Sequence, residues 1–208
     1  FFWALALTEH WQFDHRPTGL TALKWKIADR LIFSKWREAL GGCVKTIITG
    51  ASACPMRVMR TFNAAGIRVS EGYGMTAAAP ALSFCRPEPG GTLLGTVGPL
   101  LEGVEVRLVH SPDFREGEGE IVAKSPGVMV GYFQQPEKTA EVLREIDGER
   151  WLATGDVGTF VEANGRKYLK ITDRKKELLK TSHGKYIAPA PIESALKEHI
   201  LVEQAMVV

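Results

Sequence analysis

Residues 170–193, KITDRKKELLKTSHGKYIAPAPIE, are the stretch from which the rest of the chain can be interpreted. A turn at Gly165 and a strand-like run from Lys167 to Ile171 lead into it, and eight cationic and two anionic side chains fall between Arg166 and Lys185. Lys and Arg are seldom buried without a partner, so the run is either a solvated face or an anion site where Arg174 and nearby lysines meet phosphates. Charge alone favours the solvated face.

The composition predicts a folded chain. It has 208 residues, 45% hydrophobic and 24% charged, enough for one large domain or two small ones. The net charge of +2 gives no global field that would attract nucleic acid or an anionic membrane. Three cysteines without CxxC or Cys/His spacing (Cys43, Cys54 and Cys85) and five scattered histidines predict reduced thiols and no metal ligands.

The two ends look cut. The apolar opening, FFWALAL, is too short for a membrane span and lacks the basic start of a signal peptide. The chain begins without Met, and the strand-like residues 203–208, EQAMVV, run into the last position. We therefore expect a piece of a longer polypeptide with no transmembrane segment. We expect a cytoplasmic location and leave peripheral membrane contact open.

A strand, helix, strand unit is expected in the first third. A helix precedes it between Gly19 and Leu40, because apolar residues recur at helical spacing in one row (Leu20, Leu23, Ile27 and Leu31) and a flanking row (Ala28, Ile32 and Trp36). Residues 44–49, VKTIIT, predict a buried strand, Pro55–Gly66 a helix, and Ile67–Ser70 a second strand. The two strands should be parallel with a right-handed crossover.

Two loops follow those strands, GASAC (50–54) and EGYGMT (71–76). In open α/β sheets, ligands bind beyond the carboxyl ends of the strands, and small residues let a ligand approach the backbone. Tyr73, between two glycines, is expected to expose an aromatic face suited to stacking on a purine. The alternative is a plain βα loop with a Gly-rich bend.

The remaining sequence predicts short antiparallel strands. Residues 104–109, 120–124 and 128–133 alternate between apolar and polar and are separated by turn signals, which is typical of a small sheet or barrel. A helix is expected after Pro136, and a hairpin at Asn164-Gly165. After Pro191, residues 192–200 predict a helix and 202–208 a strand, which would begin a new α+β unit.

Three motifs occur in the order EGYGMT (71–76), WLATGD (151–156) and ITDRKKELLKTSHGKYIAPAPIE (171–193). This order resembles the acyl-adenylate-forming superfamily of acyl-CoA synthetases, luciferases and peptide-synthetase adenylation domains. The DRKKEL form is most similar to long-chain fatty acyl-CoA synthetases, and similar segments such as LGTVGPLLEGVEVRL extend the resemblance over nearly the whole chain.

The resemblance implies an α/β fold in four parts. Residues 1–86 would be the parallel βαβ portion of the large N-terminal lobe, and 87–172 a small antiparallel β-barrel-like subdomain. Residues 173–176 would be a hinge, and 177–208 the start of an α+β C-terminal cap. We expect the cap portion to be partly ordered or supported by a partner, because about thirty residues are too few for a core.

The implied activity is that of a long-chain fatty acid:CoA ligase. A fatty acid and ATP, with Mg²⁺, would give an acyl-AMP and pyrophosphate, and coenzyme A would then displace AMP. Two other readings stay open: a fatty acyl-AMP ligase that passes the acyl group to a carrier protein, and a non-catalytic nucleotide- or acyl-binding relative. A nucleic-acid-binding module ranks last, because few aromatic residues lie among the cations.

The resemblance also implies site residues. Tyr73 would lie against adenine, with the backbone of Glu71 and Gly72 at the edge of the base and Gly74 in the same loop. Asp156 would accept both ribose hydroxyls, and Arg174 would contact ribose or phosphate. Thr76 would bind a phosphate oxygen and Lys180 would lie near the phosphates, and both would be catalytic. Gly50 and Ala51 would separate the nucleotide from the acyl chain, and Gly184 would lie beside the pantetheine channel.

Each assignment has a structural alternative. Asp156 would be a turn residue, Tyr73 a core aromatic and Arg174 part of a surface ion pair, which contributes little. Lys167 and Lys175 are interpreted as surface charges. The order of the motifs favours the functional reading.

Three departures from the family pattern are expected to matter. Ala77 stands where the family usually has a Glu that helps to hold magnesium. The Ser/Thr/Gly-rich phosphate loop does not occur, and the lysine used in adenylation would lie beyond Val208. We therefore expect these 208 residues alone not to form acyl-AMP.

Overall fold

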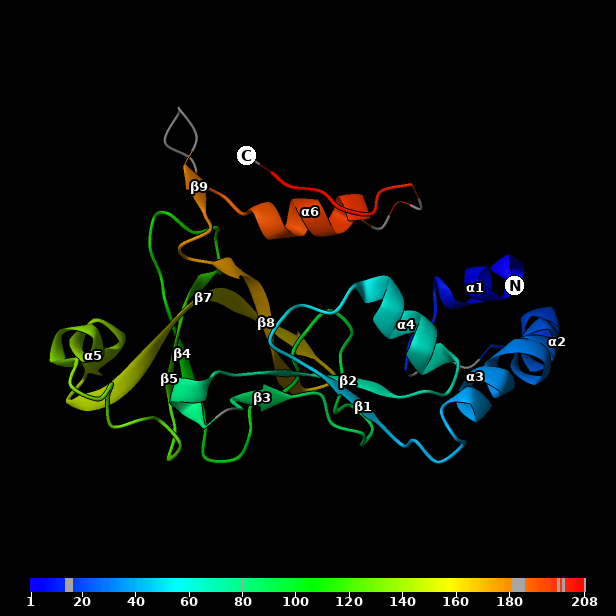
Figure 1. Cartoon of the computed structure of the whole chain (residues 1–208), viewed down its shortest axis with the longest axis horizontal. Coiled ribbons are helices and arrows are strands. Elements are labelled where there is room, and N and C mark those ends of the chain that lie inside the picture. The colour runs from blue at the N-terminus through cyan, green and yellow to red at the C-terminus, as the bar shows by residue number, and fades with distance from the viewer. Residues whose placement is uncertain (14–16, 80, 181–185, 198, 200, 208) are drawn as a thin grey trace. The chain divides into compact units, whose positions relative to one another are not determined.

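The computed structural model describes residues 1–208 except 14–16, 80, 181–185, 198, 200 and 208. Contacts divide the chain into two compact units, Phe1–Glu71 and Gly72–Val208, each of which is described by itself (Figure 1). Within the described residues, no helix combines the length and apolar character needed to cross a membrane.

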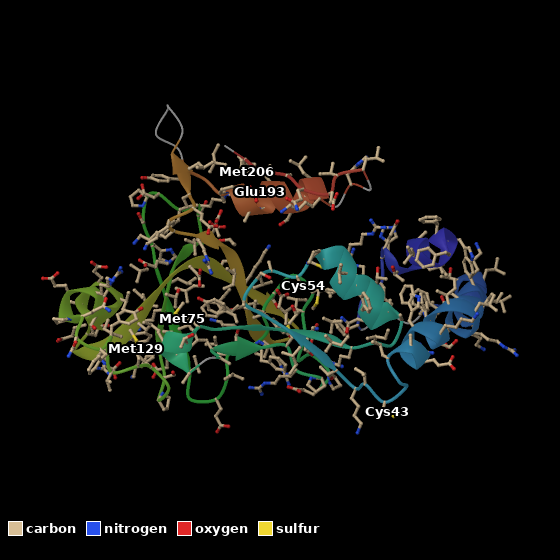
Figure 2. The ribbon with its side chains drawn as sticks, in the orientation of Figure 1. Cys43, Cys54, Met75, Met129, Glu193 and Met206 are labelled. Atoms are coloured by element: carbon tan, nitrogen blue, oxygen red, sulfur yellow. The ribbon has the colours of Figure 1, made fainter. Side chains whose placement is uncertain are left out.

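The first unit is mainly helical. Its elements are α1 (Phe2–Thr8), α2 (Gly19–Ala28), the π-helical turn η1 (Asp29–Phe33), α3 (Ser34–Ala39), β1 (Ile47–Thr49), α4 (Met56–Ala64) and the start of β2 (Val69–Tyr73). Its core is small and contains the buried residues Ala4, Ala28, Phe33 and Ala65. Of its two cysteines, Cys43 is exposed and Cys54 is half-buried, and both are free thiols (Figure 2).

The predicted helix from Gly19 to Leu40 forms, but its buried face was predicted wrongly. Leu20 is 80% exposed, and Leu23, Ile27 and Leu31 are exposed as well. Instead, Ala28 from the flanking row is buried, and Ile32 and Trp36 pack against the core. Both rows are apolar, so the tertiary contacts of α1 with α2 and α4, rather than helical spacing, decide which one is buried.

The predicted parallel strand pair is confirmed. β1 and β2 run parallel, with Ile47 opposite Val69 and Thr49 opposite Glu71, and α4 connects them. β2 continues through Tyr73, so residues 71–73 lie in a strand and not in the predicted loop.

The second unit is built on an open sheet. Its main strands are β4 (Glu105–Val109), β5 (Gly119–Lys124), β6 (Leu143–Ile146), β7 (Glu149–Ala163) and β8 (Arg166–Arg174), in the order β4-β5-β7-β6 with β8 also on β7 (Figure 1). Among the described residues no pairing joins β4 to β6 or β8, so the barrel-like closure predicted for residues 87–172 is wrong. The long β7 pairs with β6 along its first part and with β8 along its last.

Several local predictions in this unit are confirmed. Helix α5 (Pro136–Val142) starts at its proline, and Asn164 and Gly165 both have positive φ in the turn between β7 and β8. The predicted strand at 128–133 is wrong. Val130 and Phe133 there are 86% and 87% exposed, so alternation in this stretch does not reflect a buried sheet face.

Smaller elements complete the unit: β3 (Ser83–Phe84), the 3₁₀ turn η2 (Thr76–Ala78), the β9 (Leu179–Lys180) and β10 (Tyr186–Ile187) pair, and α6 (Pro189–Lys197). The predicted final strand is wrong, because residues 201–207 form no strand. Instead the Val207 N–H donates to Glu193 Oε1 on α6 at 3.0 Å. Figure 2 labels Glu193 and Met206, the neighbour of Val207. Among the described residues after 177 only Ala188 is buried, so this segment has no core of its own.

Candidate functional site

Asp156, in β7, is the centre of the candidate site. Its side chain is largely buried, and both carboxylate oxygens carry a partner. Tyr73 Oη donates to Asp156 Oδ2 at 2.7 Å, and Arg174 Nε lies 3.3 Å from Asp156 Oδ1. Three of the residues predicted from separate motifs therefore come together, from the last residues of β2 and β8 and from the middle of β7.

A bulge in the hairpin puts Arg174 opposite Asp156. Beyond the turn, Ala163 pairs with Arg166, and this register continues to Gly158 opposite Ile171. An unbroken register would set Asp156 against Asp173, two carboxylates. The shift between Val157 and Gly158 instead pairs Asp156 with Arg174, because an extra residue on β8 moves every later partner by one.

Thr154 fixes the backbone beside Asp156. Its Oγ1 donates to the carbonyl oxygen of Ile121 at 2.9 Å and accepts the N–H of Asp156 at 3.1 Å. Thr154 thus anchors the site to β5. Sequence reasoning missed this role, although a Thr two residues before the Asp in TGD is a recognisable local hydrogen-bonding pattern.

Tyr73 is less exposed than predicted. Its ring packs against two clusters of the sheet core, one around Leu82 and Leu152 and one around Ile121 and Leu169. Burial raises the pKa of the Tyr73 hydroxyl far above its usual range, and the negative charge of Asp156 raises it further. The hydroxyl therefore stays protonated and remains a donor to Asp156.

Asp173, next to Arg174, is the first residue of the predicted hinge. It is buried, and its Oδ1 accepts the N–H of Arg174 at 2.6 Å. Burial raises the pKa of the Asp173 carboxyl, while the hydrogen bond from the Arg174 N–H opposes that rise. β8, in which Asp173 lies, contacts α6.

The first unit holds three of the predicted residues. Gly50 and Ala51 are exposed after β1, and Ala51 has φ +65°, the left-handed conformation. Glu71 is buried, and its Oε1 accepts the N–H of Cys54 at 3.0 Å. The Glu71 side chain therefore holds the 50–54 loop, a role that the sequence did not reveal.

The pKa of Glu71 is raised, because burial opposes ionisation more than the Cys54 N–H favours it. The folded state thus binds this proton more tightly than the unfolded state, so stability falls as the pH rises from about 4, the unfolded pKa, through the folded pKa. In Glu71→Gln the side chain keeps an acceptor for Cys54 but cannot ionise. We expect the wild type to gain stability relative to Glu71→Gln as the pH is lowered from about 7 to about 4.

Urea unfolding at several pH values measures this difference. Glu38→Gln, at an exposed glutamate of α3 in the same unit, is the control for removing one carboxylate from the first unit. A wild type that loses stability relative to Glu71→Gln at lower pH would contradict the assignment.

The other predicted site residues form no hydrogen bond or ion pair with Asp156 among the described residues. Thr76 is exposed in η2, and Gly74 is half-buried beside Tyr73. Gly72 has a packing reason to be glycine, because a Cβ there would lie 2.9 Å from Phe84 Cδ2. For Lys180 only the backbone, in β9, is described. Gly184 lies outside the described residues.

The magnesium-directed carboxylate expected after Thr76 is absent, because residue 77 is alanine. Ala77, the position expected to carry a carboxylate, packs against the Leu82 and Leu152 cluster, and its carbonyl oxygen accepts the N–H of Met129 at 2.8 Å. Among the described residues no group of three or more His, Cys, Asp or Glu side chains is arranged to hold a metal ion.

Comparison with known families decides the assignment. A family profile described as AMP-binding enzyme matches residues 12–133, which is more than half of the chain. The chain belongs to the AMP-binding enzyme family. The motif order from which the resemblance was inferred is therefore confirmed at the level of the family.

Among AMP-binding enzymes, the chain is similar to long-chain ligases. Long-chain-fatty-acid–CoA ligase 6 of Homo sapiens is 39% identical over 173 residues, 81% of this chain and 24% of that protein. Long-chain-fatty-acid–CoA ligase 1 of the same species is 40% identical over 184 residues, which cover 86% of this chain and 25% of that protein. The peroxisomal long chain acyl-CoA synthetase 6 of Arabidopsis thaliana is 38% identical over 189 residues, 87% and 26%. The chain spans about a quarter of the length of these curated relatives.

Solved structures of AMP-binding enzymes confirm the α/β fold. O-succinylbenzoate coenzyme A synthetase from Bacillus subtilis, in complex with ATP and magnesium, matches 83% of this chain and 37% of its own, with a TM-score of 0.64 and 28% identity. The anthranilate CoA ligase AuaEII with anthranoyl-AMP matches 79% and 31%, with a TM-score of 0.64 and 25% identity.

Proposed function

We propose that the chain is part of an ATP-dependent long-chain fatty acid:CoA ligase. The whole enzyme converts a fatty acid and ATP to acyl-AMP and pyrophosphate, and then transfers the acyl group to coenzyme A with release of AMP. The observation that carries the proposal is the Asp156 cluster, in which residues from all three motifs meet. The names of the similar ligases support the choice of substrates.

In this proposal Asp156 holds the ribose. A carboxylate has about four acceptor sites, and Tyr73 and Arg174 use one on each oxygen, so both ribose hydroxyls find an acceptor without displacing them. Arg174 Nη1 also lies 4.0 Å from Glu177 Oε1, and with the Arg174 side chain 61% exposed, its other guanidinium N–H groups are open to a phosphate. Tyr73 lies against adenine, Thr76 and Lys180 contact phosphate, and Gly50 and Ala51 separate nucleotide from acyl chain.

We expect the 208-residue chain alone to release no pyrophosphate from ATP and a long-chain fatty acid. It provides ribose contacts but neither a carboxylate at position 77 nor a phosphate loop. A coupled assay for pyrophosphate measures this, with heat-denatured chain as the control. ATP- and fatty-acid-dependent turnover above that control would contradict the division of roles.

Two other functions fit parts of the site. A fatty acyl-AMP ligase would use the same nucleotide contacts and pass the acyl group to a carrier protein, so dependence of turnover on coenzyme A in the full-length enzyme separates it from the main proposal. Ala77 favours a non-catalytic nucleotide- or acyl-binding relative. If Ala77→Glu in the full-length enzyme brings no gain in MgATP use, that reading is favoured.

The domain boundaries belong to the same proposal. Residues 1–86 and 87–172 form parts of the large lobe, 173–176 the hinge and 177–208 the start of the cap. The hydrogen bond from the Arg174 N–H to Asp173 and the contact of β8 with α6 support a hinge at this position. Gly184 would lie beside the coenzyme A channel. A cytoplasmic location with peripheral membrane contact stays a prediction.

A further inference from the structure

Glu120, in β5, is a buried carboxylate that none of the nucleotide roles uses. Its side chain is 5% exposed, and its Oε2 contacts two cations. Lys175 Nζ lies 2.8 Å away and Arg144 Nη1, from β6, 3.1 Å away. A buried carboxylate needs such partners, because an unpaired charge in the interior is strongly unfavourable. Lys175, interpreted from sequence as a surface charge, is therefore anchored to the sheet.

The strand geometry connects this ion pair to the candidate site. Successive side chains of a strand point to opposite faces. Glu120 on β5 is opposite Val157 on β7, the neighbour of Asp156, so Glu120 and Asp156 lie on opposite faces of the sheet. Arg174, the last residue of β8, contacts Asp156, and Lys175, the first residue after β8, reaches Glu120. The backbone is held too, since the Lys175 N–H donates to the Gly155 carbonyl oxygen at 2.9 Å.

We propose that Glu120 is a positioning residue: by holding Lys175 it fixes the backbone of residues 173–175 so that Arg174 stays against Asp156. The inference rests on the proposed function, which makes Asp156 and Arg174 nucleotide contacts and residues 173–176 the pivot.

Arg144 makes the contact releasable. When Lys175 moves away, Glu120 keeps one cation and is not left as an isolated buried charge. Lys175 is itself 47% exposed, so its ammonium returns to water at little cost. Glu120 thus stabilises the conformation of the hinge described here, and this contact can break when the hinge changes conformation.

Amide hydrogen exchange of the ligand-free chain, measured residue by residue by NMR, tests the proposal. We expect Glu120→Gln to speed exchange of the Lys175 amide at least about tenfold, because the local opening that exposes this N–H becomes easier. Amides in the centre of β5 and β7, such as those of Val122 and Ala153, should stay within about threefold of the wild type. Lys175→Met should speed exchange at residue 175 by a similar factor.

A double-mutant cycle separates positioning from general loss of structure. In a Lys175→Met background, Glu120→Gln should not speed amide exchange at residue 175 any further. Lys175→Arg, made in the otherwise wild-type chain, keeps a cation at this position and should keep exchange at residue 175 slow. Lys167→Met is the matched control, because Lys167 lies in β8, which ends just before Lys175, and pairs with the exposed Glu162; it should leave exchange at residue 175 unchanged.

Three results would overturn the proposal: uniform acceleration over β5, β7 and residue 175; equal acceleration by Glu120→Gln with and without Lys175; or unchanged exchange in Lys175→Met. If Glu120→Gln does not fold, Lys175→Met and Lys175→Arg still decide, because they change only the exposed partner. The exchange experiment contains no nucleotide. A negative outcome would therefore not disprove nucleotide binding by the chain, and a chain that binds no nucleotide would show the same exchange rates.

Discussion

Asp156→Asn is expected to weaken AMP binding by roughly 30- to 150-fold, or about 2 to 3 kcal/mol, which is the contribution of one to two hydrogen bonds to a charged group. The carboxylate is buried between Tyr73 and Arg174 and is proposed to accept both ribose hydroxyls. An amide keeps one acceptor oxygen, loses the negative charge and presents two donors where acceptors are needed. Titration of the chain with AMP, followed by NMR or calorimetry, measures the change.

Asp147→Asn is the matched control for this prediction. Asp147 also pairs with an arginine, Arg107, but its side chain is 75% exposed and none of the nucleotide motifs contains it. The affinity of Asp147→Asn for AMP should stay within about twofold of that of the wild type. Against 2′,3′-dideoxy-AMP, the wild type and Asp156→Asn should differ by no more than about threefold. Asp156→Asn binding AMP as tightly as the wild type would contradict the assignment.

Gly98→Ala is expected to destabilise the second unit by about 3 kcal/mol or more. Residues 97–98 bond to Leu169 of β8 through both backbone groups. A Cβ at Gly98 would lie 2.4 Å from the carbonyl carbon and oxygen of Phe84, and φ is +86°. Overpacking against rigid backbone and a left-handed conformation each cost about 1 to 3 kcal/mol, so the sum is a large part of a typical domain stability.

Gly117→Ala separates the two contributions. Gly117 has φ +80°, but a Cβ there would meet no atom within 4 Å. Gly117→Ala should therefore lower the free energy of unfolding only by the cost of the left-handed conformation, about 1 kcal/mol. Urea unfolding followed through amide signals of β7 and β8 gives both values. Equal losses in the two variants would show that the close approach at Gly98 is relieved at no cost.

Local chemistry explains what could be predicted from sequence. The turn at Asn164-Gly165 and the proline at the start of α5 are determined by the residues themselves, and both are confirmed. Parallel pairing of β1 and β2 follows from the helix between them, and it is confirmed as well.

Long-range packing explains the errors. The helix from Gly19 to Leu40 carries two apolar rows, and only contacts with other helices decide which row is buried. Residues 128–133 alternate as a strand would, yet Val130 and Phe133 are exposed in irregular backbone. In the part of the chain that the structure describes, β6 and β8 both pair with β7 and neither pairs with β4, so the sheet stays open.

The candidate site shows the same division. Motif order was enough to predict Tyr73, Asp156 and Arg174, which the structure places together. The bulge that brings Arg174 opposite Asp156 leaves no clear signal in the sequence, and neither does the contact between Glu120 and Lys175, which are 55 residues apart. Such pairs depend on strand register and become visible only in the folded chain.

The central claim is that this chain binds the nucleoside part of AMP around Asp156. Titration of ¹⁵N-labelled chain with AMP tests it most directly, because amide shifts locate the ligand residue by residue. We predict the largest shifts at residues 72–74, at Gly155 and Asp156, and at Arg174. Largest shifts elsewhere, for example at residues 130–133, or no shifts at millimolar AMP, would contradict the account.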